Sequence, residues 1–230
     1  MGEPGKIGII AGGGDLPRLL ISACRAAGRE PFVLALSDYA DPALTEGVEH
    51  AWVRLGAMGE AFAALKAAGV TEVVFAGAIR RPSLAALKPD ARGAAFIARV
   101  GGKALGDDGL LRAVAAEFAR EGLVLKGAHE ILADILARPG LYGSIAPDAA
   151  ALSDIARGVE VAKGIGALDV GQGAVVQQGM VLAVEAVEGT DRMLGRCGEL
   201  MREGPGGVLV KVCKPGQDRR LDLPTIGVST

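Results

Sequence analysis

The first half of the sequence alternates short apolar runs with segments of helical pattern, and this alternation restricts the fold more than any other feature. Five runs, each typical of a buried strand, lie at residues 6–11, 31–36, 51–54, 71–76 and 123–126. Strands that alternate with helices pair in parallel through crossover connections, and they place ligands at their carboxyl ends. The alternation therefore predicts an α/β fold whose N-terminal, Rossmann-like domain is built on a parallel sheet.

Three segments in this half have the spacing of amphipathic helices. Their predicted buried residues are Leu19, Leu20 and Ala23 in the first, Phe62 and Leu65 in the second, and Leu111, Val114 and Phe118 in the third. These segments are expected to cover the sheet, since a parallel sheet is normally buried on both faces.

The first strand leads into a glycine-rich loop, Gly12-Gly13-Gly14-Asp15-Leu16-Pro17. The dinucleotide-binding fingerprint G-x-G-x-x-G fails here because its last position falls on Pro17. Glycines still let a ligand approach the backbone closely, and Pro17 suits the first turn of a helix. The four loop residues from Gly12 to Asp15 are therefore predicted to bind substrate, with a purely tight turn as the alternative.

The carboxyl end of another predicted strand carries further candidates. Gly77 and Ala78 follow the run at 71–76, and they are predicted to bind substrate at the same sheet edge as the glycine loop. Arg80 and Arg81 come next, where a phosphate would accept paired hydrogen bonds. Two solvated arginines before a proline are the alternative interpretation.

Two aspartates between glycines, Asp107 and Asp108, open the third predicted helix. A single acid at a helix start is routine capping, worth about 0.5–2 kcal/mol. Two adjacent aspartates indicate a role beyond capping, and Asp107 is predicted to bind substrate. Farther along, His129 follows the last strand of this half, where it is either a phosphate donor or a polar group satisfied within the fold.

Composition changes at residues 138–143, where a proline and two glycines replace the alternating pattern. A chain of 230 residues is long enough for two modest domains, because a single core stops growing near ~250 residues. We therefore predict a Rossmann-like domain over residues 1–138 and a C-terminal α/β domain over residues 139–230.

The second predicted domain combines a long helix, a hairpin and a further strand. Its elements are expected at 147–166 for the helix and at 170–176, 180–185 and 208–212 for the strands. The buried face of the helix is predicted to carry Leu152, Ile155, Val159 and Ala162. The short segment 177–179 is predicted to form the hairpin turn.

Three acids lie within seven residues around the end of the second hairpin strand: Glu185, Glu188 and Asp191. Gly189 gives the backbone room to turn, and Thr190 or Asp191 is predicted to N-cap the helix that follows. Carboxylates at such a turn can hold a hard cation, and free backbone N–H groups at a helix start can face a phosphate. An ordinary strand–loop–helix with solvated acids is the alternative interpretation.

The ionisable and sulfur-containing residues exclude several classes of protein. With 25 Lys and Arg against 27 Asp and Glu, the chain has a net charge of −2 and no basic stripe, which excludes nucleic acid as a partner. Three widely spaced cysteines indicate reduced thiols in a cytosol, and two histidines are too few for a zinc cluster. Any metal is therefore expected to be a hard cation on oxygen ligands, Mg²⁺ or Mn²⁺.

Targeting signals are also missing from the sequence. It begins without the basic and apolar regions of a signal peptide, and no apolar run approaches the roughly 20 residues of a membrane span. We therefore predict a cytoplasmic protein, and the sequence leaves homo-oligomer formation open.

Five segments of the sequence coincide with the pattern of one enzyme family. They lie at 11–17, 106–112, 169–176, 181–191 and 222–227, the last of which is Asp-Leu-Pro-Thr-Ile-Gly. With these segments the sequence resembles the LpxI-type UDP-2,3-diacylglucosamine pyrophosphatases of lipid A biosynthesis, from residue 6 to its end. The resemblance implies a small N-terminal and a larger C-terminal domain, with the lipid-linked substrate held in a chamber between them.

The resemblance also implies the reaction and its participants. Members of the family hydrolyse the pyrophosphate of UDP-2,3-diacylglucosamine to UMP and 2,3-diacylglucosamine 1-phosphate (lipid X), with Mg²⁺. Their critical aspartate lies in the Asp-Leu-Pro-Thr-Ile-Gly motif and corresponds to Asp222. Asp222 is thus the implied catalytic residue and, together with the acids of residues 185–191, a metal ligand. Three further residues of the matching segments are predicted to bind substrate: Gln172, Gly189 and Thr190.

Two expectations follow from comparing this sequence with the family pattern. Family members continue beyond the last motif, whereas this sequence ends at Thr230, so the C-terminal domain is expected to be truncated relative to the family. A chain without a span that acts on a diacylated substrate is expected to contact the cytosolic face of the inner membrane peripherally.

Two other functions are compatible with the residues themselves. The strand–glycine-loop–helix start suggests an NAD(P)-dependent oxidoreductase, although Pro17 and the carboxylates of the second half speak against it. The early end of the sequence suggests a non-catalytic nucleotide- or lipid-binding module. NAD(P)H binding would support the first alternative, and absence of turnover with Mg²⁺ and a UDP-sugar lipid would support the second.

Overall fold

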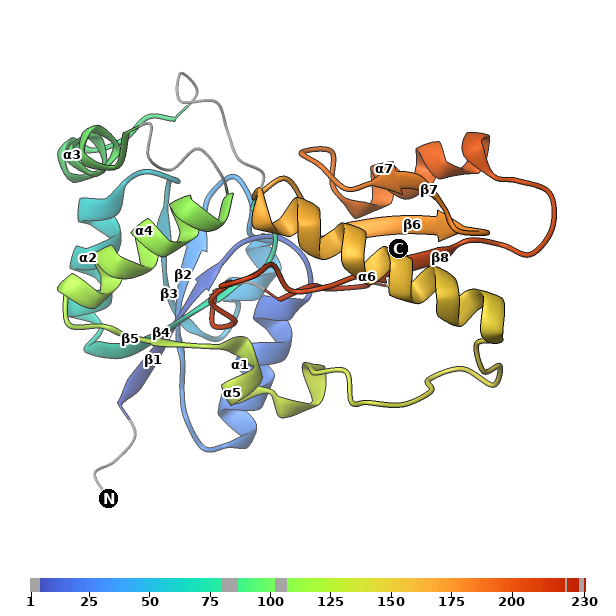
Figure 1. Ribbon diagram of the computed structural model, residues 1–230. Coiled ribbons are helices and arrows are strands. Elements are labelled where there is room, and N and C mark those ends of the chain that lie inside the picture. Colours follow the sequence, from blue (N-terminus) through green and yellow to red (C-terminus); the bar gives the residue numbers. More distant parts are fainter. Residues whose placement is uncertain (1–4, 80–86, 102–106, 222, 228–229) are drawn as a thin grey trace. The chain divides into compact units, whose positions relative to one another are not determined.

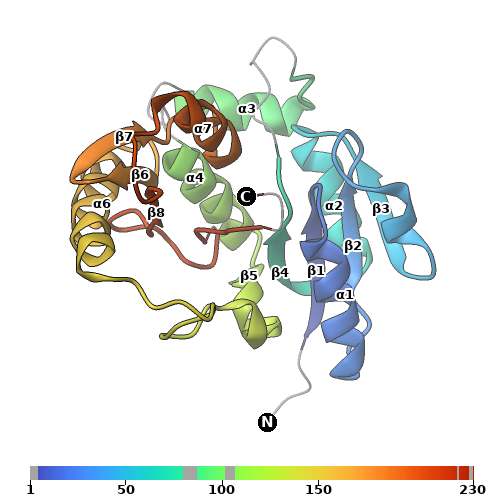
Figure 2. The ribbon, with the colours of Figure 1, turned by 90° about the vertical axis from the view of Figure 1, so that its right-hand side faces the viewer.

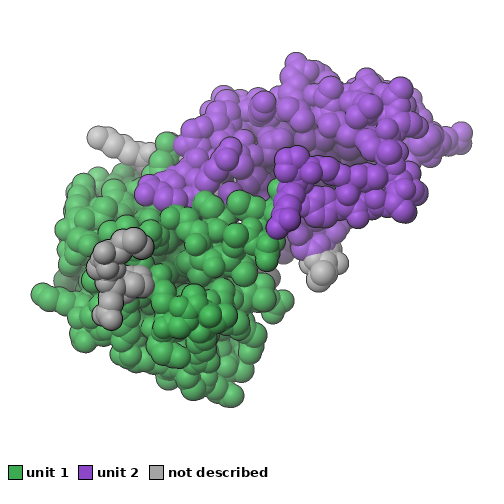
Figure 3. All heavy atoms as spheres, turned by 90° about the horizontal axis from the view of Figure 1, so that it is seen from below, with its two compact units in different colours: residues 1–105, 109–137 green, residues 106–108, 138–230 purple. Residues whose placement is uncertain are grey.

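The computed structural model describes residues 5–79, 87–101, 107–221, 223–227 and 230, without the side chains of residues 107 and 108. The chain divides into two compact units (Figure 3). Unit 1 consists of residues 1–105 and 109–137, and unit 2 of residues 106–108 and 138–230.

Unit 1 is built on a five-stranded parallel sheet (Figure 1). Its strands are β1 (Lys6–Ala11), β2 (Phe32–Leu36), β3 (Glu49–Val53), β4 (Val70–Ala76) and β5 (Val124–Lys126), in the order β3-β2-β1-β4-β5. All four pairings are parallel. The order reverses between β1 and β4, and the carboxyl side of that point is where open α/β sheets bind ligands.

Helices cover both faces of this sheet (Figure 2). They are α1 (Leu16–Ala26), α2 (Met58–Ala67), α3 (Ala91–Val100), α4 (Asp107–Arg120) and α5 (Ala128–Ile131), with short 3₁₀ turns at Pro42–Thr45 and Ala133–Ile135. Helices α1 and α5 share one face, whereas α2 and α4 pack on the other. Helix α3 lies against α2, and it falls in a stretch that the sequence pattern did not assign to any element.

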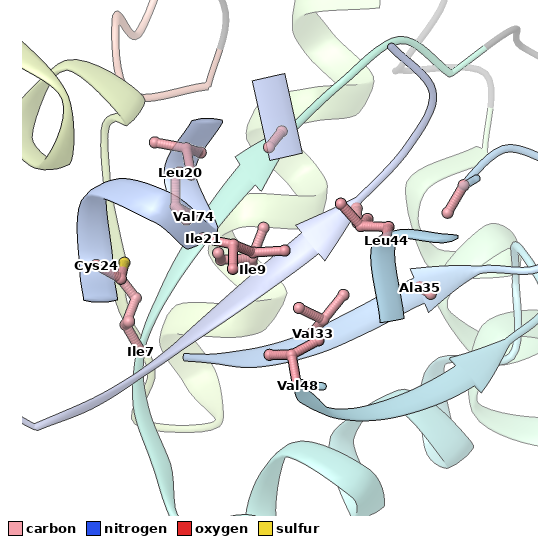
Figure 4. Close-up of a cluster of buried hydrophobic side chains, with 13 residues drawn as sticks. Ile7, Ile9, Leu20, Ile21, Cys24, Val33, Ala35, Leu44, Val48 and Val74 are labelled. Carbon is pink, nitrogen blue, oxygen red and sulfur yellow. The ribbon is translucent and has the colours of Figure 1, made fainter. Parts of the chain in front are cut away.

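The main core of unit 1 lies between α1 and the sheet (Figure 4). Alternate residues of β1, such as Ile7 and Ile9, are fully buried there against Leu20 and Cys24 of α1. Burial of an aliphatic side chain of this size contributes about 1.5–3 kcal/mol. Leu19, predicted to share this buried face, is instead half exposed, because the helix turns its Pro17, Leu20, Ile21 and Cys24 stripe inward.

On the opposite face, aromatic rings join two helices to the sheet. Phe118 of α4 makes edge-to-face contacts with Phe62 of α2 and Phe75 of β4, at centroid distances of 4.9 and 5.1 Å. Such pairs add about 0.5–1.5 kcal/mol beyond their buried area. The predicted packing of α2 through Phe62 and Leu65 is confirmed, since both side chains are buried.

A buried carboxylate joins α3 and α4. Glu117 is buried and pairs with Arg99, with Arg120 at 2.9 Å and with Arg92 at 3.6 Å. Burial alone would raise the pKa of the Glu117 carboxyl, but the hydrogen bonds and charges of the three arginines outweigh it and lower that pKa. The carboxylate is therefore held ionised within the helix pair.

Unit 2 is built on a three-stranded antiparallel sheet. Its strands are β6 (Gly173–Gln177), β7 (Met180–Val184) and β8 (Val208–Lys211), in the order β7-β6-β8, and its helices are α6 (Ala149–Ala167) and α7 (Thr190–Cys197), the latter followed by a 3₁₀ turn at Gly198–Leu200. Helix α6 packs on β6 and β8, and α7 packs on β7. A small core of Val175, Ala183, Met193 and Cys197 lies under α7.

The predicted hairpin is confirmed, and its turn is held from α6. Gln178 and Gly179 both have positive φ angles, 54° and 76°, as the favoured two-residue hairpin turn requires. The buried carboxylate of Asp154 accepts their two backbone N–H groups at 2.8 and 2.6 Å. Asp154 thus satisfies donors that the tight turn would otherwise leave unpaired.

The buried face of α6 differs from the predicted one. Of the predicted residues, Ala162 is buried but Leu152 is more than half exposed, whereas Asp154, Gly158 and Gly166, which were not predicted, are buried. A Cβ atom on Gly158 would lie 2.5 Å from a methyl group of Val210 in β8, so the helix approaches the strand too closely for any side chain there. Small residues therefore face the sheet in α6, because the helix lies too close to β8 to leave room for large apolar side chains.

The observed elements confirm the predicted α/β fold class, with a parallel sheet in the N-terminal region and a smaller sheet with helices in the C-terminal region. The three cysteines are free thiols, and Cys24 and Cys197 are buried in the cores. Within the described part of the chain, no helix has the length and apolar character needed to cross a membrane.

Candidate functional site

The predicted site residues fall into two sets, one in each unit. Six of them lie in the loops after β1 and β4 of unit 1, and six lie around the β7–α7 connection and before β6 in unit 2. Asp107 is the first residue of α4, and its side chain is outside the described residues. Asp222, Arg80 and Arg81 also lie outside them.

In unit 1, the glycine loop pairs with the loop after β4. The Gly13 and Ala78 backbones exchange two hydrogen bonds, each 2.9 Å long, and the Gly12 N–H donates to the Ala76 carbonyl at 2.8 Å. The two loops therefore close over the point where the strand order reverses. These N–H groups are engaged within the protein and are not free to bind an anion.

Two glycines in these loops are explained by the close approach of the backbones. A Cβ atom at Gly12 would lie 2.7 Å from the Ala78 carbonyl oxygen, and one at Gly77 would lie 2.4 Å from the Gly13 oxygen. Gly77 also has a φ angle of 92°, which other residues rarely adopt. Both glycines are needed for the fold whether or not they also contact substrate, and their substrate contact stays a prediction.

The rest of the glycine loop is open. Gly14 has a φ angle of 86° and no atoms within 4 Å of the position of a Cβ. Asp15 is exposed at the N-cap of α1, and its side chain makes no capping hydrogen bond, while Pro17 takes its expected place in the first turn. Gly14 and Asp15 are thus the predicted loop residues that the structure leaves most accessible to a ligand.

His129 lies at the start of α5, directly after β5. Its Nδ1 atom is buried and has no hydrogen-bond partner among the described residues. Next to it, the Glu130 carboxylate accepts the Gly127 N–H at 2.7 Å, and this hydrogen bond lowers the pKa of Glu130. The structure therefore does not show His129 Nδ1 satisfied within the described part of the fold, and the role of His129 as a phosphate donor stays a prediction.

In unit 2, Glu185 is the centre of a buried polar network. One of its carboxylate oxygens accepts the Thr190 hydroxyl at 2.6 Å, and the other accepts the Gln172 backbone N–H at 3.2 Å. Glu185 and Thr190 are both buried. The structure thus brings together three of the predicted residues, which come from the β7–α7 loop and the segment before β6.

A lysine at the end of β8 completes this network. The Lys211 ammonium donates to the Thr190 hydroxyl at 2.6 Å and to the Thr225 carbonyl at 3.1 Å, and it lies 3.8 Å from Glu185 Oε1. The Lys211 side chain is only 11% exposed. Because Thr190 accepts from Lys211, its single hydroxyl proton is directed at Glu185.

Two glycines make room for the Glu185 side chain and backbone. A Cβ atom at Gly171 would lie 2.0 Å from the Glu185 carbonyl oxygen, and one at Gly173 would lie 3.0 Å from Glu185 Oε2. The intervening Gln172 places its side-chain Oε1 in a buried position without a hydrogen-bond partner among the described residues. The alternation of glycines around Gln172 therefore follows from the close packing against Glu185.

The other two predicted metal ligands have separate partners. Glu188 accepts two hydrogen bonds from the Arg196 guanidinium, at 3.0 and 2.6 Å, while Asp191 accepts the Thr230 hydroxyl at 2.9 Å. No group of three or more potential metal-binding side chains occurs among the described residues. In this geometry the acids of residues 185–191 do not form a shared metal site, and Asp222 remains the only predicted ligand whose surroundings are not described.

The start of α7 differs from the predicted one. Gly189, with a φ angle of 81°, is the N-cap residue, and neither Thr190 nor Asp191 caps the helix with its side chain. The Thr190 hydroxyl is directed at Glu185 instead. The N-cap prediction was wrong because tertiary contacts of Thr190 outweigh its local capping preference.

The segment before Asp222 contains a local ion pair. Arg220 donates two side-chain hydrogen bonds to Asp218, at 3.0 and 2.6 Å. Arg219 and Arg220 precede Asp222 in the sequence, and a guanidinium close to a carboxyl group favours the ionised form of that group. Arg220 is partnered by Asp218, and its relation to Asp222 stays a prediction.

Lys211 is the site residue that the sequence pattern did not reveal. It lies within an apolar run that was predicted to be a strand, Val208 to Val212, and nothing local distinguishes it from a lysine at the surface. The sequence contained one weak indication of such a role, because Lys211 is a charged residue within an otherwise apolar strand. Only the pairing of β8 with β6 shows that Lys211 lies opposite Gly173, next to Glu185.

Comparison with known proteins covers nearly the whole chain. The LpxI N-terminal domain matches residues 6–135, and the LpxI C-terminal domain matches residues 138–230. The UDP-2,3-diacylglucosamine pyrophosphatase LpxI of Caulobacter vibrioides is 47% identical over 232 residues, which cover 98% of this chain and 82% of that protein. These matches favour a hydrolase over the oxidoreductase and binding-module alternatives.

Proposed function

This chain belongs to the LpxI family of hydrolases, and we propose that it cleaves the pyrophosphate bond of UDP-2,3-diacylglucosamine in lipid A biosynthesis. The observation that carries the proposal is the relative at 47% identity over 98% of this chain, whose name states that substrate. The products would be UMP and 2,3-diacylglucosamine 1-phosphate.

The proposed reaction is the attack of one water molecule on one phosphorus of the pyrophosphate. One P–O bond forms to the water oxygen, the bridging P–O bond breaks, and the leaving phosphate keeps the bridging oxygen. Such a transfer requires neutralisation of charge on the phosphate oxygens and an oriented water, but little covalent chemistry from the protein. A base that accepts a proton from the water would further lower the barrier.

The chain's own residues can be assigned to these tasks as proposals. Asp222 is the proposed group that orients the water or binds the metal. Gly14 and Asp15, at the open part of the glycine loop, are proposed to contact the nucleotide end of the substrate. The Glu185 network in unit 2 would hold the segment that follows Asp222.

A divalent cation, Mg²⁺ or Mn²⁺, is part of the proposal, and when bound it would neutralise phosphate charge. The contacts of Glu185, Glu188 and Asp191 do not fit a common ligand set, as described above. We therefore assign no step to the metal. We expect EDTA to abolish the activity and added Mg²⁺ or Mn²⁺ to restore it. Full activity in metal-free buffer would contradict the metal requirement.

The experiment that tests the function is turnover of purified chain with UDP-2,3-diacylglucosamine, with the products identified by ³¹P NMR. We expect two phosphomonoesters to replace the pyrophosphate signals. The variant Asp222→Ala should lower the rate by a factor of order 10² or more while substrate still binds, as for loss of a metal ligand or base.

The matched control for Asp222 is Asp218→Ala. Asp218 lies four residues earlier and is paired with Arg220, so its loss should change turnover no more than a few-fold. A wild-type chain that leaves the substrate intact would refute the proposed function. A folded Asp222→Ala variant within a few-fold of the wild-type rate would refute the role of Asp222 alone.

The proposed substrate also bears on location and assembly. A lipid with two acyl chains resides in a membrane, so we propose a cytoplasmic enzyme that contacts the inner membrane from its cytosolic face. Co-sedimentation with vesicles containing the substrate would support that contact. A homo-oligomer is compatible with the proposal and would be measured by sedimentation equilibrium.

A further inference from the structure

The ammonium of Lys211 lies next to the Glu185 carboxylate. Its three protons have three oxygen neighbours: Thr190 Oγ1 at 2.6 Å, the Thr225 carbonyl at 3.1 Å and Glu185 Oε1 at 3.8 Å. A divalent cation on the same carboxylate would be repelled by this ammonium at close range. Glu185 is therefore the counter-ion of Lys211 in this structure.

Lys211 is also unavailable to a substrate phosphate. Its side chain is 11% exposed, and that of Glu185 is 9% exposed, so the pair is largely shielded from solvent. Breaking a buried ion pair by removing one partner leaves an uncompensated charge, which is strongly unfavourable. The contacts of Lys211 are thus made within the protein and not kept open for a ligand.

The contact with Thr225 gives this pair a role beyond packing. Thr225 belongs to the segment 223–227, which directly follows Asp222 in the chain. The segment has no regular secondary structure, so its position depends on specific contacts. Thr230, three residues beyond the segment, is tied to the first turn of α7 by its hydrogen bond to Asp191 at 2.9 Å.

We propose that Lys211 is a positioning residue of the active site, which ties the segment 223–227, the segment that follows Asp222 in the sequence, to the Glu185–Thr190 pair. Glu185 then acts as the counter-ion that holds the Lys211 ammonium and not as a metal ligand. The consequence for catalysis rests on the proposed function, whereas the tether itself does not.

The test uses the full chain with the substitution Lys211→Met, which removes the ammonium and keeps the length of the side chain. Its matched control is Lys214→Met, because the Lys214 side chain is equally 11% exposed and also pairs with one carboxylate, Asp169, at 2.7 Å. The first measurement is the NMR order parameter of the backbone amides of residues 225–227. We expect values below about 0.6 in Lys211→Met, as in a flexible backbone, and unchanged values in Lys214→Met.

The second measurement separates positioning from metal binding. With UDP-2,3-diacylglucosamine as substrate, Lys211→Met should lower kcat at least about tenfold and change KM less than about threefold, because substrate binding is kept while the segment 223–227 loses its tether. Glu185→Gln should leave the half-saturating Mg²⁺ concentration within about twofold of wild type, whereas loss of a metal ligand would raise it about 10-fold or more.

Each outcome decides the proposal. Unchanged order parameters at residues 225–227 in Lys211→Met would overturn the tether, and a large rise in the Mg²⁺ requirement of Glu185→Gln would make Glu185 a metal ligand. If Lys211→Met fails to fold, Thr190→Val removes the hydroxyl that links Lys211 to Glu185 and is judged by the same order parameters. A wild-type chain without hydrolase activity would refute the proposed function but leave the order-parameter test of the tether intact.

Discussion

The two units hold their predicted site residues by different means. In unit 1 the glycine loop is held by backbone hydrogen bonds, with the paired Gly13 and Ala78 as the contact between the loops after β1 and β4. In unit 2 the site is built on charged or polar side chains, and the buried Glu185 has the largely shielded Lys211 as its partner. The site loops of unit 1 are therefore sensitive to added side-chain volume, whereas the Glu185 site of unit 2 is also sensitive to lost charge.

The substitution Gly77→Ala should have the largest effect on stability, and it breaks the backbone contact of unit 1. The added Cβ would lie 2.4 Å from the Gly13 carbonyl oxygen, at a φ angle of 92°. Steric overlap and backbone strain together should lower the free energy of unfolding by about 3 kcal/mol or more. The fluorescence of Trp52 during denaturation reports this, because this single tryptophan lies in β3 of unit 1.

Gly14→Ala is the control for Gly77→Ala. Gly14 has a similar φ angle of 86°, but no atoms lie within 4 Å of its added Cβ. Only the backbone strain of about 1–2 kcal/mol should then appear. Equal losses in the two variants would show that the approach of the two loops contributes nothing.

Asp154→Ala should have the next largest effect, and it is confined to unit 2. The turn N–H groups of Gln178 and Gly179 lose a charged acceptor, which should lower stability by about 2–3 kcal/mol. Hydrogen exchange at these two amides should rise, while the Trp52 transition of unit 1 stays in place. Asp148→Ala, which removes only the exposed N-cap of α6, should lower stability by about 1 kcal/mol.

Acid should weaken unit 1 through Glu117. Because its folded-state pKa is lowered, the stabilisation from the ionised carboxylate is complete above its ordinary pKa of 4.5 and is lost as the pH falls through the lower, folded value. Glu117→Gln should therefore be less stable than wild type at pH 7, by about 1–3 kcal/mol, and the difference should shrink below pH 4.5. Denaturation followed by Trp52 fluorescence at a series of pH values measures the stability of both proteins as a function of pH.

The pH dependence has its own control in Glu160→Gln. Glu160 pairs with Arg157 on the exposed surface of α6 in unit 2, so its loss should not change the Trp52 transition at any pH. A difference between Glu117→Gln and wild type that stays constant from pH 7 to pH 3 would show that ionisation of Glu117 does not stabilise the fold.

The smallest effect is expected from Glu188→Gln. Glu188 and Arg196 form a partly exposed ion pair, and such pairs contribute about 0–1 kcal/mol. Since Arg196 already engages this carboxylate, the half-saturating Mg²⁺ concentration should stay at the wild-type value. A strongly raised Mg²⁺ requirement would instead return Glu188 to the metal site predicted from the sequence, and it would make the charged network of unit 2 part of the chemistry.

The sequence by itself determined the fold class and most of the strands. Strand β1 has the predicted bounds, and β4 begins one residue before the predicted run, because a buried parallel strand needs an uninterrupted apolar run between breakers. The hairpin turn that contains Gln178 and Gly179 could also be predicted from the sequence, because only a few residue types favour its backbone conformation. The family motifs identified the enzyme family for a similar reason, because each motif is a short continuous segment of the sequence.

Only the tertiary structure decided how distant segments meet. It turned the Gly158 side of α6 inward where the pattern had favoured Leu152, and it placed Lys211 beside Glu185 and Thr190. Local periodicity measures how apolar a face is, but not how closely the neighbouring backbone approaches it. Likewise, a lysine in an apolar strand acquires its partner only when the pairing of β8 with β6 sets the register, which no local pattern encodes.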